Sequence, residues 1–349
     1  MMLTLASGGE RDALGMRLRS IAILPASLLL FACGLELGWP SACEAAQARQ
    51  PPATNPLWRE PKTRNYLPDM TWPEVQALLA RTDMVIIPVG ALEQHGPQGP
   101  IGTDFYNGVE QAKLIAQETD ILVAPILMVG NSPYHMGFPG TITLSAETVQ
   151  RVYFEAVQSL LRHGFRRFVL LNAHGGNAAT TRFIVDRINQ ETAGVAVELT
   201  EAAQPFSDEK HTPAEVRAEN DALPRIAGFD RHSGVEETSQ SLYLIPSLVN
   251  LPAATPAPVI LPPHLKAMLP QVIAHERTAD LLFLAEALKA KETGKHTSTR
   301  EMTPTGNWSV ADIAKQASAA RGKARTDAFV SASVQFIETW KQARPIRPE

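Results

Sequence analysis

The sequence predicts an α/β protein built on a largely parallel sheet. Short apolar runs alternate with amphipathic helical patterns along the chain, and polar residues cluster directly after several of the apolar runs. Buried strands separated by helices are typical of parallel sheets covered on both faces. In such sheets the functional residues gather in the loops after the carboxyl ends of the strands.

The elements can be placed in order along the chain. A first helix is expected after Thr71, where Glu74 completes a capping box and Pro73 occupies the first turn. The apolar runs predict strands over 84–89, 121–125, 166–172 and 195–199. The helical patterns predict helices over 104–118, 145–162 (with Ser145 as cap) and 177–191, then 276–291 and 309–341. "VILPPHL" (259–265) predicts a strand with its exit loop.

The N-terminal segment has the pattern of a secretory signal peptide, which we place at residues 1–48 with a start at Met16. Two arginines precede an apolar run that is too short for a transmembrane helix. This favours export to the periplasm over a buried N-terminal helix. Ala46-Gln47-Ala48 fits a cleavage site, and "LFAC" at Cys33 is an alternative that would give a lipid anchor. Residues 49–63 read as a Pro-rich linker and 64–349 as a single catalytic domain.

Composition limits the partners. The net charge is −4 and no block of like charges occurs, so neither nucleic acid nor an anionic membrane surface is expected as a partner. Both cysteines lie in the N-terminal segment, and the domain itself therefore offers no thiol.

The loop "PVGALEQHGPQGPIGTDF" (88–105) contains Glu93, His95 and Asp104. Residues two apart on an extended segment share a face, so Glu93 and His95 could reach neighbouring metal ions. Asp104 starts the next helix, where it could be an N-cap or a carboxylate that bridges two cations. Taken alone, the trio could also be an ordinary polar turn.

A second glycine-rich turn, "NAHGGN", carries His174 between a predicted strand and a helix. Gly175 and Gly176 allow close approach of the backbone to a ligand, and Asn177 could cap the helix. An anion site at the helix N-terminus is the alternative, but the spacing matches no nucleotide-binding motif.

A third turn, "RHSGVEETS", offers His232 and Glu237. Three loops that each supply histidine or carboxylate are the composition of a two-metal hydrolytic site. Imidazole and carboxylate ligands suit zinc or manganese, with iron as a further option, and the lack of thiols argues against a structural zinc site.

The order of four motifs resembles the creatininase (creatinine amidohydrolase) family. These are "VGALEQHGPQGPIGTD", "SPYHMGFPGTITLS", "NAHGGN" and "HSGVEETS", which span about residues 67–245. The resemblance implies a three-layer α/β/α fold, a homo-oligomer, and hydrolysis of C–N bonds in amides and cyclic amides with two divalent metal ions.

The resemblance also implies roles for particular residues. Glu93, His95, Asp104 and His174 match metal ligands, with Asp104 as the bridge, and His232 matches a histidine implicated in proton transfer. Creatinine-hydrolysing members carry a metal-binding glutamate where this chain has Gly176, and so we expect Glu237 to supply the missing carboxylate as ligand or catalytic group. Creatinine itself is therefore a doubtful substrate.

We expect the substrate to be a small amide contacted by His135, Gly175, Gly176 and Asn177, although His135 could equally be a structural histidine. A peptidase-like member of the family and an exported binding protein with a degenerate site are the alternatives. No G-x-S-x-G motif supports a serine hydrolase.

Overall fold

The computed structural model describes residues 53–344 apart from 227, 257, 261–262, 275, 277, 280 and 283–298. The predicted signal peptide, including Cys33 and the cleavage site after Ala48, lies outside the described residues. So does most of the helix predicted over 276–291. In the described part of the chain, no helix combines the length and the apolar character needed to cross a membrane.

A four-stranded parallel sheet with the order β2–β1–β3–β4 forms the centre of the fold. Its strands are β1 (Met84–Val89), β2 (Leu122–Val123), β3 (Arg167–Asn172) and β4 (Val195–Glu198). β1 and β3 pair along their whole length and end together, with Val89 opposite Asn172. The loops that follow these two strands therefore leave the sheet at the same edge.

Helices make up most of the remaining structure. The α-helices are α1 (Trp72–Leu79), α2 (Thr103–Thr119), α3 (Ala146–Arg162), α4 (Ala178–Glu191), α5 (Leu199–Ala203), α6 (Ala214–Asp221), α7 (Val235–Leu244), α8 (Pro263–Lys266), α9 (Leu269–Ile273), α11 (Thr299–Met302), α12 (Ile313–Gln316) and α13 (Ala319–Ala343). Short 3-10 turns are η1 (Leu67–Asp69), η2 (Pro133–His135), η3 (Gly175–Asn177), η4 (Gln204–Phe206), η5 (Pro246–Leu248) and η6 (Leu251–Ala253). A small antiparallel sheet pairs β5 (Asp230–His232) with β6 (Trp308–Ser309).

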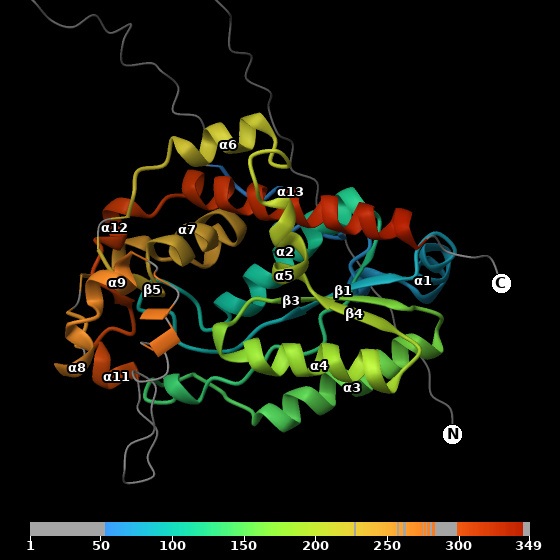
Figure 1. The fold of residues 1–349 in the computed structure, drawn as a ribbon, viewed down its shortest axis with the longest axis horizontal. Helices are drawn as coiled ribbons and strands as arrows, with labels where there is room; N and C mark the ends of the chain where they lie inside the picture. Colours follow the sequence, from blue (N-terminus) through green and yellow to red (C-terminus); the bar gives the residue numbers. More distant parts are fainter. Residues whose placement is uncertain are drawn as a thin grey trace, which may run out of the picture. The chain divides into compact units, whose positions relative to one another are not determined.

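Helices cover both faces of the central sheet, which gives the predicted three layers (Figure 1). Along β1, Val85 and Ile87 pack into an apolar cluster with α3 and α4. Met84 and Ile86 point the opposite way, into a cluster with α2, α5 and α13. Every residue of β1 is buried, as expected for a strand inside a sheet covered on both faces. The predicted α/β/α class is therefore confirmed.

Two predicted helix starts are confirmed by their caps. Thr71 and Glu74 form the capping box of α1, in which the Thr71 backbone N–H donates to the Glu74 carboxylate at 2.7 Å. Ser145 Oγ accepts from the Thr148 backbone N–H at 3.2 Å at the start of α3. Asn177 occupies the N-cap position of α4 as expected, but its side chain makes no hydrogen bond to the first turn of that helix.

The C-terminal third was predicted less well. Residues 259–260 form no strand, and α8 begins at Pro263, so the strand predicted from "VILPPHL" is wrong. Proline lacks the backbone donor that a strand ladder needs. The single helix predicted over 309–341 is divided into β6, α12 and α13. A new N-cap causes the last break, since Ser318 Oγ accepts from the Arg321 N–H at 3.2 Å.

The described part of the expected linker, residues 53–63, packs against the domain. Asn55 is buried, and its side chain donates to Glu110 on α2 at 2.7 Å. Its backbone N–H donates to the carbonyl of Tyr243 on α7 at 2.9 Å. These bonds join the segment to two helices that also carry residues of the site described below.

The contribution of Arg167, at the start of β3, to the stability of the fold can be tested by mutation. Its side chain is 1% exposed and contacts Asp83 through Nε at 2.6 Å. We expect Arg167→Ala to lower the free energy of unfolding by about 3 kcal/mol, because it leaves the Asp83 charge unpaired. Urea denaturation measures the change. The control Arg151→Ala breaks an exposed helical pair with Glu155 and should cost no more than about 0.5 kcal/mol. Equal losses of unfolding free energy in the two variants would contradict a stabilising role of the buried Arg167–Asp83 pair.

Candidate metal centre

The loop after β1 holds Glu93 and His95 in a rigid arrangement. The Glu93 N–H donates to the Ile101 carbonyl at 2.9 Å, and the Gly99 N–H donates to the His95 carbonyl at 3.0 Å. Gly90 lets the start of this loop pass against α2, since a Cβ there would lie 2.6 Å from Phe105 Cα. The Gly and Pro residues noted in the sequence therefore belong to a loop closed by its own hydrogen bonds.

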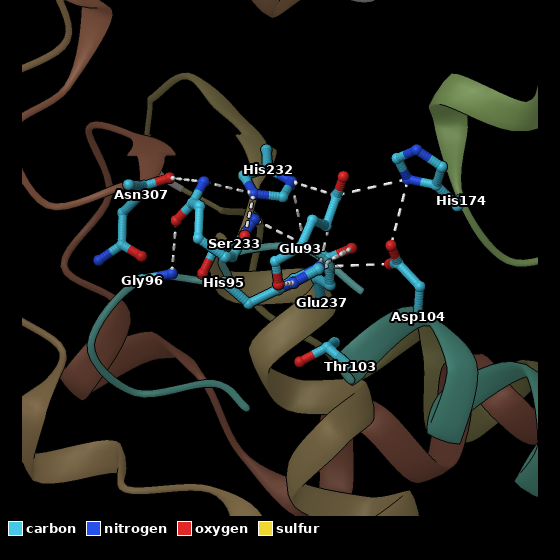
Figure 2. Close-up of polar contacts among 12 residues, drawn as sticks. Glu93, His95, Gly96, Thr103, Asp104, His174, His232, Ser233, Glu237 and Asn307 are labelled. Carbon is cyan, nitrogen blue, oxygen red and sulfur yellow. Dashed lines mark hydrogen bonds and ion pairs between the residues drawn. The ribbon is translucent and has the colours of Figure 1, made fainter. Parts of the chain in front are cut away.

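Four separate elements bring the five predicted ligands together (Figure 2). Glu93 and His95 come from the loop after β1, and Asp104 comes from the first turn of α2, for which Gly102 is the N-cap. His174 follows β3, and Glu237 lies in the first turn of α7.

Asp104 lies between the two predicted histidine ligands. Its Oδ1 is 3.2 Å from His95 Nε2, and its Oδ2 is 3.1 Å from His174 Nδ1. Glu237 Oε1 is 3.4 Å from His95 Nε2, and Glu93 Oε1 is 3.4 Å from His174 Nδ1. The five side chains thus form two groups that share the Asp104 carboxylate.

Hydrogen bonds on the far side of each imidazole fix its orientation. His95 Nδ1 lies 3.1 Å from the Glu93 carbonyl, which leaves Nε2 facing the carboxylates. His174 Nε2 lies 3.0 Å from the Asn131 carbonyl and 3.1 Å from Ser132 Oγ, which leaves Nδ1 facing them. Metal-binding histidines commonly have such a partner on the second nitrogen.

The residues of this cluster fit a bound cation. Glu93 Oε2, His95 Nε2 and Asp104 Oδ2 are buried and form no well-directed hydrogen bond among the described residues, although His95 Nε2 and Asp104 Oδ2 lie at ion-pair distance from their neighbours. Buried polar atoms are nearly always paired, so ligand atoms that converge without directed hydrogen bonds suit a shared cation. The atoms of Glu93, Asp104 and His174 lie close enough together to hold a metal ion.

Mutual electrostatics stabilises the charged forms of these groups. Burial alone would lower the pKa of His174, but the Glu93 and Asp104 carboxylates outweigh it and hold that pKa well above its ordinary value. Glu237 and Asp104 do the same for the pKa of His95. Burial would raise the pKa of Glu93, but the surrounding histidines lower it overall. In the metal-free site, protons on histidines therefore balance the carboxylates.

His135 and His232 lie beside this cluster, and with Glu93 they are near enough to one another to hold a metal ion by distance alone. Their rings stack, with centroids 4.2 Å apart and planes inclined by 28°. Nitrogen lone pairs lie in the ring plane, so two nearly parallel rings cannot direct them at a common point. The stacked pair is therefore a poor site for a third ion.

His135 is buried beside the predicted ligands, with its Nε2 3.6 Å from Glu93 Oε2. Its Nδ1 lies 3.0 Å from Gln94 Nε2 and 2.9 Å from Thr299 Oγ1. Burial and the neighbouring His232 lower its pKa to about 3, so the ring is neutral. Of the two interpretations of His135, the geometry favours the structural histidine.

The "GGN" turn serves two purposes. A Cβ at Gly176 would overlap the His174 imidazole and lie 2.5 Å from the Asn131 carbonyl, whereas a Cβ at Gly175 would meet nothing within 4 Å. Asn177 is fully buried, and it donates to the Gly90 carbonyl at 2.9 Å and accepts from the Asn131 N–H at 2.9 Å. Asn177 thus joins two loops of the site, and its expected contact with substrate stays a prediction.

The sequence analysis missed several residues that surround the centre. Gln94 Nε2 lies 2.9 Å from His232 Nε2 and donates to the Gly306 carbonyl at 3.1 Å. Gln98 donates to Asn307 Oδ1 at 2.9 Å. Gln94 lies between Glu93 and His95 in the sequence, and this position could have identified it as a residue of the site. The sequence gives no such signal for residues 306–307, because they reach the site only through the pairing of β5 with β6.

Comparison with known proteins places this geometry in a family. The model of the creatininase family, described as creatinine amidohydrolase, matches residues 68–337. The chain belongs to the creatininase family. The resemblance inferred from the four motifs is thereby confirmed.

Curated relatives of this creatininase-family chain are hydrolases with different names. Creatinine amidohydrolase of Pseudomonas putida is 33% identical over 213 residues, covering 57% of this chain and 79% of that protein. 3-Dehydro-scyllo-inosose hydrolase of Thermotoga maritima is 35% identical over 117 residues, covering 33% of this chain and 38% of that protein. The match thus spans well under half of the Thermotoga protein. Mycofactocin precursor peptide peptidase of Mycobacterium tuberculosis is 32% identical over 194 residues, covering 51% of this chain and 67% of that protein.

Solved structures show the same fold. A crystal structure of creatinine amidohydrolase (creatininase) aligns with a TM-score of 0.55 at 23% identity, covering 81% of this chain and 99% of that one. A structure named "Creatininase Mn" aligns with a TM-score of 0.56 at 23% identity, covering 81% and 100%. With the family and its relatives, the chain is a hydrolase of the creatininase family.

The two adjacent glycines provide a matched test of the His174 turn. We expect Gly176→Ala to lower the free energy of unfolding by about 1–3 kcal/mol, because the added methyl group must displace the His174 ring or the Asn131 backbone. Gly175→Ala, which faces open space, should change it by less than about 0.5 kcal/mol. Chemical denaturation of both metal-free variants measures the difference. A neutral Gly176→Ala would contradict the geometry.

Proposed function

We propose that this chain is a metal-dependent amidohydrolase that cleaves the C–N bond of a small amide or cyclic amide. The observation that carries the proposal is the position of Asp104, with one oxygen 3.2 Å from His95 and the other 3.1 Å from His174. A carboxylate that offers one oxygen to each of two ligand groups is arranged to bridge two cations roughly 3.5–4 Å apart.

The ligand sets follow from the distances. Glu93, Asp104 and His174 would hold one cation, and their ligand atoms lie close together. His95 and Glu237, which lie close together with His232, would hold the other, and the second Asp104 oxygen, 3.2 Å from His95, would be shared with it. Sets of imidazole and carboxylate suit zinc or manganese, and iron is compatible. In support, relatives of the same fold include structures named "Creatininase Mn" and a mutant creatininase of "Zn-Zn type".

Glu237 is the proposed replacement for the carboxylate that Gly176 lacks. Its Oε1 faces His95 at 3.4 Å, and its Oε2 accepts from the Ser233 N–H at 2.5 Å. Burial would raise the pKa of Glu237, but His95 and His232 lower it overall, so the carboxylate is charged as a ligand must be.

In the proposed reaction, water adds to the amide carbonyl, the C–N bond breaks, and one proton of the water ends on the leaving nitrogen. Two bound divalent cations supply Lewis-acid polarisation of the carbonyl and make water acidic enough to react near neutral pH. Glu93, Asp104 and Glu237 would hold the cations and so fix the positions of the reacting groups.

His232 is the proposed proton-transfer group. Its Nε2 lies 2.8 Å from the Gln94 carbonyl and can donate to it, which leaves Nδ1 facing the centre. This nitrogen lies 3.6 Å from Glu93 Oε1 and 3.9 Å from Glu237 Oε2. From there it can receive a proton and return it to the leaving group, a role commonly worth roughly 10²–10⁴-fold in rate.

The relatives leave a peptidase-like activity as the second candidate, since one of the three curated relatives above is named a precursor peptide peptidase. A binding protein with a degenerate site is disfavoured. Glu93 and Asp104 are buried carboxylates that lie close to Glu237, and such a cluster is costly without cations. We also propose export, on the sequence of residues 16–48 alone.

Metal analysis and a substrate screen test the proposed function together. The wild type should bind two equivalents of divalent metal per chain and hydrolyse a member of a panel of cyclic amides, formamides and short peptides. His95→Ala and Glu237→Gln should each lose one equivalent and at least about 100-fold in kcat/KM. The exposed His163→Ala serves as control. The site assignment fails if both site variants keep full metal content and activity.

The raised pKa values of His95 and His174 predict proton release on metal binding. Cations bind neutral imidazole, so histidines that are protonated in the metal-free site must give up their protons. Apparent affinity should therefore rise with pH and fall as the pH drops below the raised pKa values of these histidines. Calorimetry at pH 7 in two buffers of different protonation enthalpy measures the release. Binding heats that do not depend on the buffer would contradict the prediction.

A further inference from the structure

A cavity of 440 Å³ opens onto the predicted metal centre from the side of α2 and α7. Asp104, His174 and Glu237 all line it. The Glu237 side chain is 29% exposed, whereas the side chains of the four other predicted ligands are each 6% exposed or less. Small molecules in solvent can therefore reach the centre from this cavity.

The wall of the cavity is polar but uncharged. Apart from the predicted ligands, its polar lining groups are the carboxamides of Asn107, Gln111, Asn172 and Gln240 and the hydroxyl of Thr200. None of the described lining residues is a lysine or an arginine. A carboxylate bound away from the metal ions would find no countercharge on this wall, and burying an unpaired charge is costly.

One face of α2 leads from the centre into the cavity. Asp104, Asn107 and Gln111 are spaced by three and four residues, which aligns them on the same side of the helix. The two carboxamides thus stand at fixed positions one and two turns from the proposed bridging carboxylate.

Asn107 and Gln111 both have hydrogen-bonding capacity left over. Asn107 is 3% exposed, and its Nδ2 donates to Ser241 Oγ at 2.9 Å, but its Oδ1 has no partner among the described residues. A buried acceptor without a partner is unfavourable by about 1–3 kcal/mol, and a donor on a ligand would satisfy it. Gln111 makes no side-chain hydrogen bond within the described residues.

We propose that this cavity receives the part of the substrate next to the scissile amide, and that Asn107 and Gln111 select an uncharged, hydrogen-bonding group over one that carries a carboxylate. This rests on the proposed function for the position of the scissile bond.

A matched pair of probes tests the selection. Hydantoin is neutral, and hydantoin-5-acetic acid has the same ring with a carboxylate added. Titration calorimetry on the zinc-loaded chain should give hydantoin at least about tenfold the affinity of its carboxylate analogue, with the products checked by mass spectrometry. Equal affinities, a preference for the carboxylate, or no binding of hydantoin at millimolar concentration would overturn the proposal.

Two variants assign the preference to residues. Asn107→Leu keeps the size of the side chain and should weaken hydantoin binding about tenfold through the lost acceptor. Gln111→Lys adds a cation and should tighten binding of the carboxylate analogue about tenfold, reversing the preference. Gln76→Leu on the outer surface of α1 is the control. Unchanged dissociation constants for both probes in both variants would overturn the proposal, provided that their zinc content equals that of the wild type.

Turnover separates this proposal from the proposed function. If the zinc-loaded chain hydrolyses no amide while the binding preferences follow the pattern above, the amidohydrolase assignment fails and the cavity assignment stands. If amides are hydrolysed with the same ratio of kcat/KM for neutral and charged substrates in the wild type and both variants, the cavity assignment fails and the hydrolase stands.

Discussion

The site depends on the parallel pairing of β1 with β3. Because the two strands end together at Val89 and Asn172, the loops carrying His95 and His174 leave the sheet side by side. The first turn of α2 then lies between them, and the Asp104 carboxylate reaches both histidines. A shift of this register by one residue would turn the strand side chains to the opposite faces and move the two loops apart.

The electrostatics of the cluster follows from that placement. The fold brings three carboxylates close together, two of them buried, and the neighbouring carboxylates favour protonation of His95 and His174. A divalent cation would take the place of these protons. The hydrogen bonds on the far nitrogens of His95 and His174 hold both rings in the orientation that this exchange requires.

The sequence was informative wherever local patterns determine the structure. The four central strands are continuous apolar runs, and the capping groups at Thr71 and Ser145 are local, so these elements were predicted closely. Glu93, His95 and His174 were singled out because they lie in loops after strands, and Asp104 because it begins the helix after the first of these loops. Thr299 and Asn307 could not be identified, since no periodic pattern marks their segment and their contacts depend on long-range packing. Asn177 occupies the expected cap position, but the hydrogen bonds of its side chain to two loops are a tertiary effect that the sequence does not reveal.

The position of Glu237 has a consequence for how the molecule holds together. Gly176 has no side chain to offer, so the carboxylate that faces His95 comes from α7, which packs along α13 rather than extending from the central sheet. Ions bound at this point would be shared by two parts of the chain that are more than 100 residues apart. Part of their binding free energy would then stabilise the packing of the C-terminal helices against the sheet. Cofactor and fold would thus be thermodynamically linked, and loss of the ions would loosen this end of the domain first.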